Sequence, residues 1–229
     1  MLAMVAFPVF AAVIMLAGPA AASWVWAWNV NPNQWPPCSG EGFDDWGTTV
    51  TNGVFTGYSD VQADGDYFCN PDTTEHEVNA GEHASPDFTV STTGTYTVTA
   101  VFSGTVYVYA SQSGCDEGTG HGTFSIGVGV TDNTTGKSYS TLQTPSGLSI
   151  SESCGSGDTA VALGSVSFMT TPVAGNVYQA NAGIDALSGA IEYDQGSNAQ
   201  DITAFDNACH QGTGNTCSSA VTLTSITVS

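Results

Sequence analysis

The densest group of acidic residues, between positions 59 and 86, could bind a hard metal ion. It includes Asp60, Asp64 and Asp66. Calcium takes roughly six to eight oxygen ligands, so these carboxylates could supply part of a structural calcium site. The stretch is not an EF-hand, because the D-x-D-x-D-G order and the final Glu are absent. A solvated acidic loop without metal is the favoured interpretation, and we expect no other cofactor.

Histidines next to carboxylates in the same stretch offer a second kind of metal chemistry. Imidazole together with carboxylate suits a transition metal better than calcium. The same solvated loop is favoured over this alternative too. The neighbours are His76-Glu77 and Glu82-His83.

Candidates for hydrolytic chemistry are few. Glu192 and Asp194 lie two residues apart in a strand-like context, which is how jelly-roll glycosidases carry their paired carboxylates. No G-x-S-x-G motif marks a serine nucleophile. Cys209, next to His210, would be a nucleophile only if it were unpaired. We therefore expect no catalytic residues.

Three tryptophans near the start of the chain are spaced for one face of a strand. Trp24, Trp26 and Trp28 alternate with Val25 and Ala27. Because side chains alternate across a strand, the indoles would form one flat apolar surface suited to stacking on sugar rings. An edge strand that caps the core is the favoured interpretation, because exposed tryptophans near a terminus promote association.

Two tyrosines, Tyr107 and Tyr109, oppose Val106 and Val108 on a predicted strand. Tyrosine suits glycan contacts, because its ring can cover the sugar face while its hydroxyl bonds to the rim. The alternative is a central strand buried on both faces. The pattern supports both interpretations equally.

Six cysteines indicate an exported, disulfide-bonded protein. Metal ligation is disfavoured, because no C-x-x-C is present and the spacings match no zinc framework. One pair closes a short polar loop, a second flanks one block of predicted strands, and the third remains. We expect the disulfides Cys209–Cys217, Cys115–Cys154 and Cys38–Cys69.

The near absence of basic residues excludes several classes of function. The chain has 21 Asp and Glu against a single Lys or Arg, Lys137, and its formal net charge is −20. Nucleic-acid binders neutralise phosphates with Lys and Arg, and phosphoryl-transfer enzymes need cationic clamps. Anionic membrane surfaces are excluded for the same reason. The partners that remain are a polysaccharide, a cell-surface glycan or a second copy of the chain.

Residues 1–22 resemble a cleaved secretory leader. The apolar run ends in Ala20 and Ala22, the A-x-A pattern of a signal-peptidase site, and Ser23 would begin the mature chain. No Lys or Arg precedes the run, so either the true start lies upstream or the leader is unusual. A membrane anchor is disfavoured, because about 17 apolar residues interrupted by proline and glycine barely span a bilayer. We expect a secreted protein with no membrane segment after cleavage.

Alternation of apolar and polar residues predicts β-strands along the mature chain. The clearest strands are 95–102, 124–130 and 178–186. The parity of the apolar positions slips near 164–165 and near 224–225, which predicts a β-bulge at the first and the same irregularity at the second. Weaker candidates are 88–91, 137–142, 191–194 and 202–205.

Many short strands separated by Gly, Asn and Asp turns predict an all-β fold. We expect a two-sheet antiparallel β-sandwich, jelly-roll or immunoglobulin-like, because Thr/Ser/Gly-rich outer faces suit sheets that are solvated on one side. Residues 87–229 would form the sandwich. Residues 23–86, rich in Trp, Pro, Asn and Asp, would form a loop-rich segment packed on it or supply its edge strands.

Residues 87–229 also resemble secreted bacterial β-sandwich modules of cell-surface proteins. The resemblance is carried by FTVSTTGTYTVTAVFSGTVYVYAS, by GVGVTDNTTGKSY and by PVAGNVYQANAGIDALSGA before a final LTSITV. It implies an extracellular sandwich of non-catalytic or unknown role, and it brings no active-site motif.

Three functions are compatible with these features. The favoured one is a secreted, non-catalytic protein that binds carbohydrate or acts as an adhesin at the cell surface. The second is a subunit of a fibre or surface coat, joined by strand addition through the first and last strands. The third is a secreted hydrolase.

Overall fold

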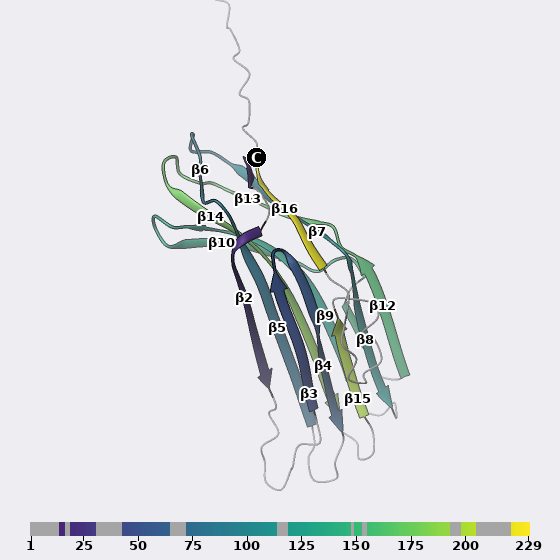
Figure 1. The fold of residues 1–229 in the computed structure, drawn as a ribbon. Coiled ribbons are helices and arrows are strands. Elements are labelled where there is room, and N and C mark those ends of the chain that lie inside the picture. Colours follow the sequence, from purple (N-terminus) through teal and green to yellow (C-terminus); the bar gives the residue numbers. More distant parts are fainter. Residues whose placement is uncertain are drawn as a thin grey trace, which may run out of the picture.

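The structure of the chain is a computed structural model in which every described element is a β-strand (Figure 1). Figure 1 shows long strands whose axes lie roughly side by side in the body of the molecule, with neighbouring chain directions that alternate. No helix among the described residues is long and apolar enough to cross a membrane. The structure describes residues 14–16, 19–30, 43–64, 72–113, 119–147, 149–152, 155–192, 198–204 and 221–229.

The first sheet has nine strands, in the order β12-β8-β15-β4-β16-β7-β13, with β3 paired to β4 and β1 to β16. Its strands are β1 (Ile14–Leu16), β3 (Phe43–Thr51), β4 (Val54–Asp64), β7 (Tyr96–Ser103), β8 (Thr105–Ser113), β12 (Gly155–Ala162), β13 (Ser165–Thr170), β15 (Asn198–Ala204) and β16 (Val221–Val228).

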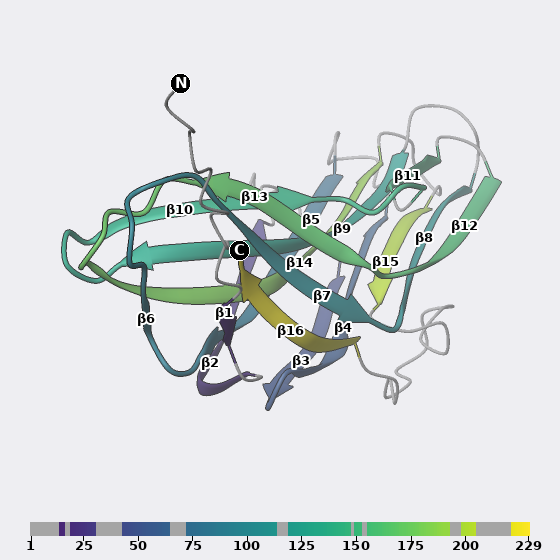
Figure 2. The ribbon, with the colours of Figure 1, turned by 90° about the horizontal axis from the view of Figure 1, so that it is seen from above.

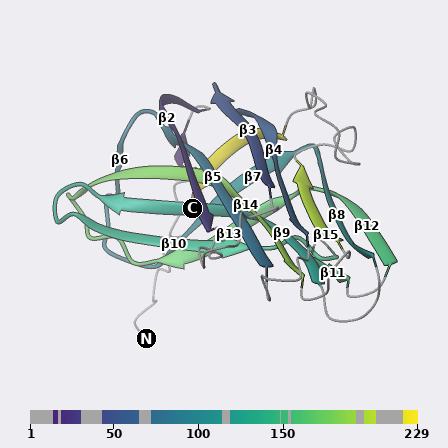
Figure 3. The ribbon, with the colours of Figure 1, turned by 90° about the horizontal axis from the view of Figure 1, so that it is seen from below.

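The second sheet has seven strands, in the order β10-β9-β14-β5-β2, with β11 paired to β9 and β6 to β14 (Figures 2 and 3). Its strands are β2 (Pro19–Val30), β5 (Asp72–Ala84), β6 (Phe88–Thr89), β9 (Thr119–Asp132), β10 (Lys137–Gln143), β11 (Ser149–Glu152) and β14 (Val177–Glu192).

The two sheets share one apolar core. Phe55 and Phe102 of the first sheet and Phe124 and Ile184 of the second belong to the same buried cluster, each at most 2% exposed. Burial of one such side chain contributes roughly 1.5–3 kcal/mol. All described strand pairs are antiparallel. The predicted all-β, two-sheet antiparallel architecture is therefore confirmed.

The strongly alternating segments form the strands predicted for them. The segment 95–102 corresponds to β7, and the segments 124–130 and 178–186 lie inside the much longer β9 and β14. One prediction is wrong: residues 191 and 192 are the end of β14, not the start of a separate strand. The apolar alternation is interrupted there, but the pairing with β5 and β9 continues.

Both predicted parity slips coincide with irregular pairing. The register of β16 against β7 shifts between Leu223 and Ser225, which leaves Thr224 as the bulged residue. At the other slip, Ala162 is opposite Thr105 but Ser165 is opposite Val101. From Ala162 to Ser165 the chain advances by three residues, whereas the opposite segment advances by four, between Val101 and Thr105. The extra residue therefore lies on the β7–β8 segment.

The segment 23–86 contributes paired strands to both sheets. β4 lies inside the first sheet, and β5 lies inside the second, between β14 and β2. β3 and β4 form a hairpin whose two turn residues, Asn52 and Gly53, have positive φ angles of 50° and 76°. An Asn-Gly turn flanked by strands is a strong hairpin signal.

Strand β2 begins inside the predicted leader. Cleavage before Ser23 would remove β1 and the first residues of β2, and it would leave the pairs from Ser23 to Val30 against β5. Ser23 is directly opposite Glu82, and its hydroxyl donates a hydrogen bond of 2.7 Å to Glu82 Oε1. This bond fixes the register of the retained part of β2.

All six cysteines lie outside the described residues, so the disulfides stay a prediction. The described pairs closest to four of them are at strand ends. Gly155, one residue after Cys154, is opposite Gln112, three residues before Cys115. Phe43, five residues after Cys38, is opposite Gln62, seven residues before Cys69. Peptide mapping of the unreduced protein is expected to recover the three predicted pairs, and cross-linked peptides in another combination would contradict them.

Candidate functional site

The structure does not place the predicted tyrosine pair on an open surface. Tyr107 is 3% exposed, and Val106 and Val108 beside it are fully buried. Tyr109 is partly buried. Since buried residues alternate with Tyr107 on both faces of β8, this part of the strand has the two-sided burial that was the alternative to a ligand-binding face.

Two of the three predicted calcium ligands belong to a strand rather than to a loop. Asp60 and Asp64 belong to β4, and Asp66 lies outside the described residues. Four residues along an extended strand span roughly 13 Å, which is too far for one ion with ligand distances of about 2.3–2.6 Å. The part of the chain that the structure describes holds no group of three or more His, Cys, Asp or Glu placed to bind a metal ion.

The other candidates for chemistry are also separated. His76, Glu77, Glu82 and His83 lie along β5, where successive residues belong to opposite faces of the sheet. Glu192 is the last residue of β14, whereas Asp194, Cys209 and His210 lie outside the described residues.

The tryptophan positions lie on the outer face of the second sheet, meaning the face turned away from the first sheet. Trp24 is opposite Gly81, Trp26 is opposite Asn79, and Trp28 is opposite Glu77. Directly opposed residues share a face, and the alternate β5 residues Val78 and Ala80 are buried in the core. The register therefore favours the sheet-face interpretation of these tryptophans over core capping.

A row of three glycines crosses the middle of this outer face. Gly127 of β9 is opposite Gly183 of β14, which in turn is opposite Gly81 of β5. We call these three residues the glycine row. Leu142 of β10 stands at one end of the row, opposite Gly127, and Trp24 of β2 stands at the other. The row itself carries no side chains, which leaves a trough across the strands, although Leu142 Cδ1 would lie 3.3 Å from a Cβ on Gly127 and covers that end.

Amide side chains stand on both sides of the glycine row. The tripeptide Asn-Ala-Gly occurs in β5 at 79–81 and in β14 at 181–183. Because the two strands are antiparallel and their glycines are opposed, Asn79 lies on one side of the row and Asn181 on the other. A Cβ atom added to Gly129 would lie 2.5 Å from Asn181 Oδ1, so that glycine makes room for the amide.

The trough is an open groove with a volume of about 180 Å³. We call it the sheet groove. Its floor is closely packed, because a Cβ atom on Gly183 would lie 2.7 Å from the Ala80 carbonyl oxygen. Its lining residues are Asn79, Gly127, Val128, Ser140, Thr141, Leu142, Asn181, Gly183 and Ile184.

A pair of carboxyl groups lies next to the sheet groove. Asp185 is opposite Asn79 on the outer face and shares a hydrogen bond with Glu77. Burial, the neighbouring Glu77 charge and this hydrogen bond raise the pKa of Asp185 to about 7. Asp185 Oδ1 is buried without a hydrogen-bond partner. At mildly acidic pH the pair therefore holds one proton, so that only one of the two carboxyl groups beside the groove is charged.

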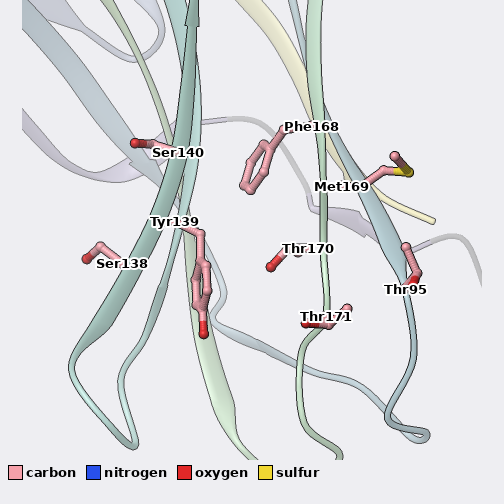
Figure 4. Close-up of a pocket in the computed structure, with 8 residues that line it drawn as sticks. All are labelled: Thr95, Ser138, Tyr139, Ser140, Phe168, Met169, Thr170 and Thr171. Atoms are coloured by element: carbon pink, nitrogen blue, oxygen red, sulfur yellow. The ribbon is translucent and has the colours of Figure 1, made fainter.

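A second, larger space separates the edges of the two sheets. It lies between β10 and β13, has a volume of about 580 Å³, and is called the edge cleft below (Figure 4). Tyr139 and Phe168 project into it from its two sides. Phe168 also packs against the core. The lining residues are Thr95, Ser138, Tyr139, Ser140, Phe168, Met169, Thr170 and Thr171.

The only cation of the chain lies beside the edge cleft. The Lys137 ammonium is 4.9 Å from the centre of the Tyr139 ring, within the range of a cation–π contact. On the opposite wall, Met169 is 75% exposed. Ser140 lines both the edge cleft and the sheet groove, so the two spaces meet at β10.

Comparison with known proteins gives structural similarity at very low sequence identity. No family model matches the chain, and no curated protein sequence is similar to it. The enzymatically active domain of bacteriophage CBA120 tailspike protein 4 is similar at 7% identity and a TM-score of 0.22, over 79% of this chain and 19% of that one. The proposals below rest on the chain's own residues.

Two carbohydrate-binding modules are also similar. TmCBM61, solved in complex with β-1,4-galactotriose, has 9% identity and a TM-score of 0.19, over 80% of this chain and 90% of that one. The family 11 module of the Clostridium thermocellum cellulase Lic26A-Cel5E has 6% identity and a TM-score of 0.20, over 93% and 95% of the two chains.

Sequence reasoning missed the sheet groove although its residues left a signal. The alternation in β9 and β14 places Gly127, Gly129 and Gly183 on the outer face. The repeated Asn-Ala-Gly was a further sign, because glycine inside a strand often marks a close approach of a ligand or a neighbouring backbone. The alignment of the glycines across three strands follows only from the register.

Proposed function

We propose that this protein is a secreted, non-catalytic binding protein that holds a neutral polysaccharide in the sheet groove. The observation that carries the proposal is the glycine row, flanked by Asn79 and Asn181 and ending at the position of Trp24. The glycine row spans three strands, and with Leu142 and Trp24 at its ends the line crosses five, of which the sheet groove covers the part from β10 to Asn79 of β5. At a strand spacing of about 4.8 Å this gives a path of roughly 19 Å, which is long enough for several sugar units.

The chemistry of the groove suits a sugar better than other ligands. An amide both donates and accepts hydrogen bonds, and it can therefore pair with neighbouring hydroxyl groups of a pyranose ring. The groove has no cation to attract a phosphate or a uronate, since the only Lys or Arg of the chain is Lys137. Leu142 at the β10 end is 55% exposed and offers an apolar surface to the face of a sugar.

The two alternative functions have less support. Strand addition could use only part of β16, because β7 occupies one side of the strand and β4 pairs with Val221 and Thr222 on the other, which leaves only Ile226–Val228 once cleavage has removed β1. Hydrolysis of a glycosidic bond needs two carboxyl groups separated by roughly 5–5.5 Å or 6.5–9.5 Å. The pair predicted from the sequence, Glu192 and Asp194, stays a prediction because Asp194 lies outside the described residues, and Asp185 and Glu77 are hydrogen-bonded to each other rather than held apart.

Replacement of Asn181 by Ala is expected to weaken polysaccharide binding about fivefold to tenfold. The loss corresponds to roughly 1 kcal/mol for hydrogen bonds at one amide. Affinity electrophoresis in gels that contain neutral polysaccharides identifies the ligand and measures the change. Gln179→Ala is the matched control, because Gln179 lies two residues away on the same face of β14 and outside the groove lining. Wild-type protein that is retarded by no polysaccharide would overturn the proposed function.

A further inference from the structure

The edge cleft has the composition of a binding site that neither the fold nor the sheet groove requires. Its two walls are strands at the free edges of different sheets, β10 of the second and β13 of the first. Between these edges the sandwich stays open, and the aromatic rings of Tyr139 and Phe168 face the open space (Figure 4).

The lining of the edge cleft combines apolar rings with hydroxyl groups and contains no acid. Tyr139 and Phe168 supply the apolar surface inside the cleft, Met169 points away from it on the other side of β13, and the remaining lining residues are all serine or threonine. This lining is unusual in a chain of net charge −20. Aromatic faces together with hydroxyl donors and acceptors match a neutral sugar, which has apolar C–H faces and a polar rim.

The edge cleft also continues the sheet groove. Leu142 ends the glycine row, and two residues earlier on the same strand Ser140 lines both spaces. Ser140 is exposed and small, so it leaves a low passage over β10. A polysaccharide that lies along the glycine row would therefore reach the edge cleft when it crosses β10.

We propose that the edge cleft is a second saccharide subsite, which holds the neutral sugar units of a polysaccharide beyond those in the sheet groove. This inference rests on the proposed function. Tyr139 and Phe168 contact the sugar faces, and Thr170 and Thr171 offer hydroxyl groups from β13 and the residue after it. Lys137 holds the Tyr139 ring through its cation–π contact, and it is not a ligand for an anionic group.

Two occupied subsites predict that affinity depends on ligand length. The second subsite adds contacts without a second loss of translational freedom, so a ligand that spans both binds more tightly than a short one. A peptide strand on the edge of β10 or β13 would run along those strands. The passage over Ser140 runs across them, and this direction favours the saccharide.

The test uses oligosaccharides of increasing length from the neutral polysaccharide that best retains the wild-type protein, with affinity measured by calorimetry. For the wild type, affinity is expected to rise until the oligosaccharide spans both spaces. In Tyr139→Ala the affinity for the longest oligosaccharides is expected to fall about fivefold to tenfold, with the shortest ones unchanged. In Ser140→Trp, at a position that lines both spaces, the longest oligosaccharides are expected to lose affinity at least as strongly. Tyr139→Phe keeps the ring and is expected to retain wild-type binding. Ser140→Trp changes an exposed position, so it tests the passage even if Tyr139→Ala fails to fold.

The outcomes separate this inference from the proposed function. Length-dependent binding that survives in both variants would overturn the second subsite and leave the sheet groove as the site. If Asn181→Ala loses binding to short and long oligosaccharides alike while neither Tyr139 variant loses any, the second subsite is likewise overturned and the sheet groove remains the site. A change in self-association without a change in saccharide affinity would make the edge cleft a protein contact and overturn the inference.

Discussion

A Trp26→Ala variant is expected to bind the polysaccharide roughly 30-fold more weakly than the wild type, a loss of about 2 kcal/mol. Trp26 is opposite Asn79, which lines the sheet groove, and Asn79 is opposite Asp185. Trp26 therefore adds one strand to the line of opposed residues Asp185 and Asn79, which runs beside the glycine row. An aromatic ring there offers a rigid apolar surface to a sugar face, and tryptophan is the residue type most often responsible for a large share of binding energy.

Val25 provides the matched control for this prediction. It is the chain neighbour of Trp26 on the opposite face of β2, where it is opposite Ala80 and 39% exposed. Val25→Ala removes apolar surface from the same strand and is expected to leave binding unchanged. A Trp26→Ala variant that melts at a lower temperature but binds as the wild type does would show that the indole serves the fold. The core-capping interpretation would then be correct.

The architecture could be predicted because strand periodicity is a local property. In β9 and β14 each core residue is two positions from the next, so a short window of sequence shows which side is buried. The bulge at Thr224 was predictable for the same reason, since an extra residue reverses the parity of the apolar positions. The second slip was placed correctly, but its extra residue lies on the partner segment, which the parity of one strand cannot reveal.

The candidate site could not be predicted because it depends on contacts between distant residues. Gly81 and Gly183 are about a hundred residues apart, and a shift of their register by one residue would move every side chain of one strand to the other face. Strand β5, which carries the part of the site from residues 72–84, also lacks a strong alternation of apolar and polar residues. In the part of β5 whose side chains are described, from residue 77 onward, the core side carries Val78, Ala80 and Ala84, together with the buried Glu82. The fold of β5 is determined by its neighbours β14 and β2 rather than by its own composition.

An Asp185→Asn variant is expected to be more stable than the wild type at pH 8. The wild type is expected to lose stability as the pH rises from about 4 to 7, and the variant should show little of this loss. Burial and the neighbouring Glu77 carboxylate raise the pKa of Asp185 from 3.8 to about 7. As the pH rises through this window, the unfolded chain releases the Asp185 proton while the folded protein still binds it. Unfolding therefore becomes easier with rising pH, and the decline ends once the folded protein has also released the proton. Because Asp185 is partly open to solvent, we expect an effect on the order of 1–2 kcal/mol.

Asparagine tests this explanation because it has the shape of protonated aspartic acid and an N–H group that can donate to Glu77. Melting temperatures of both proteins from pH 4 to pH 8 measure the difference. Asp87→Asn is the charge-matched control: it removes the same formal charge from an exposed position, and it is expected to leave the decline in place. Parallel pH profiles for the wild type and Asp185→Asn would mean that the pair does not share a proton.

Because the pair lies beside Asn79, the same variant connects stability to function. If the proton keeps the groove wall from carrying two adjacent charges, polysaccharide affinity should weaken above pH 7 in the wild type and stay constant in Asp185→Asn.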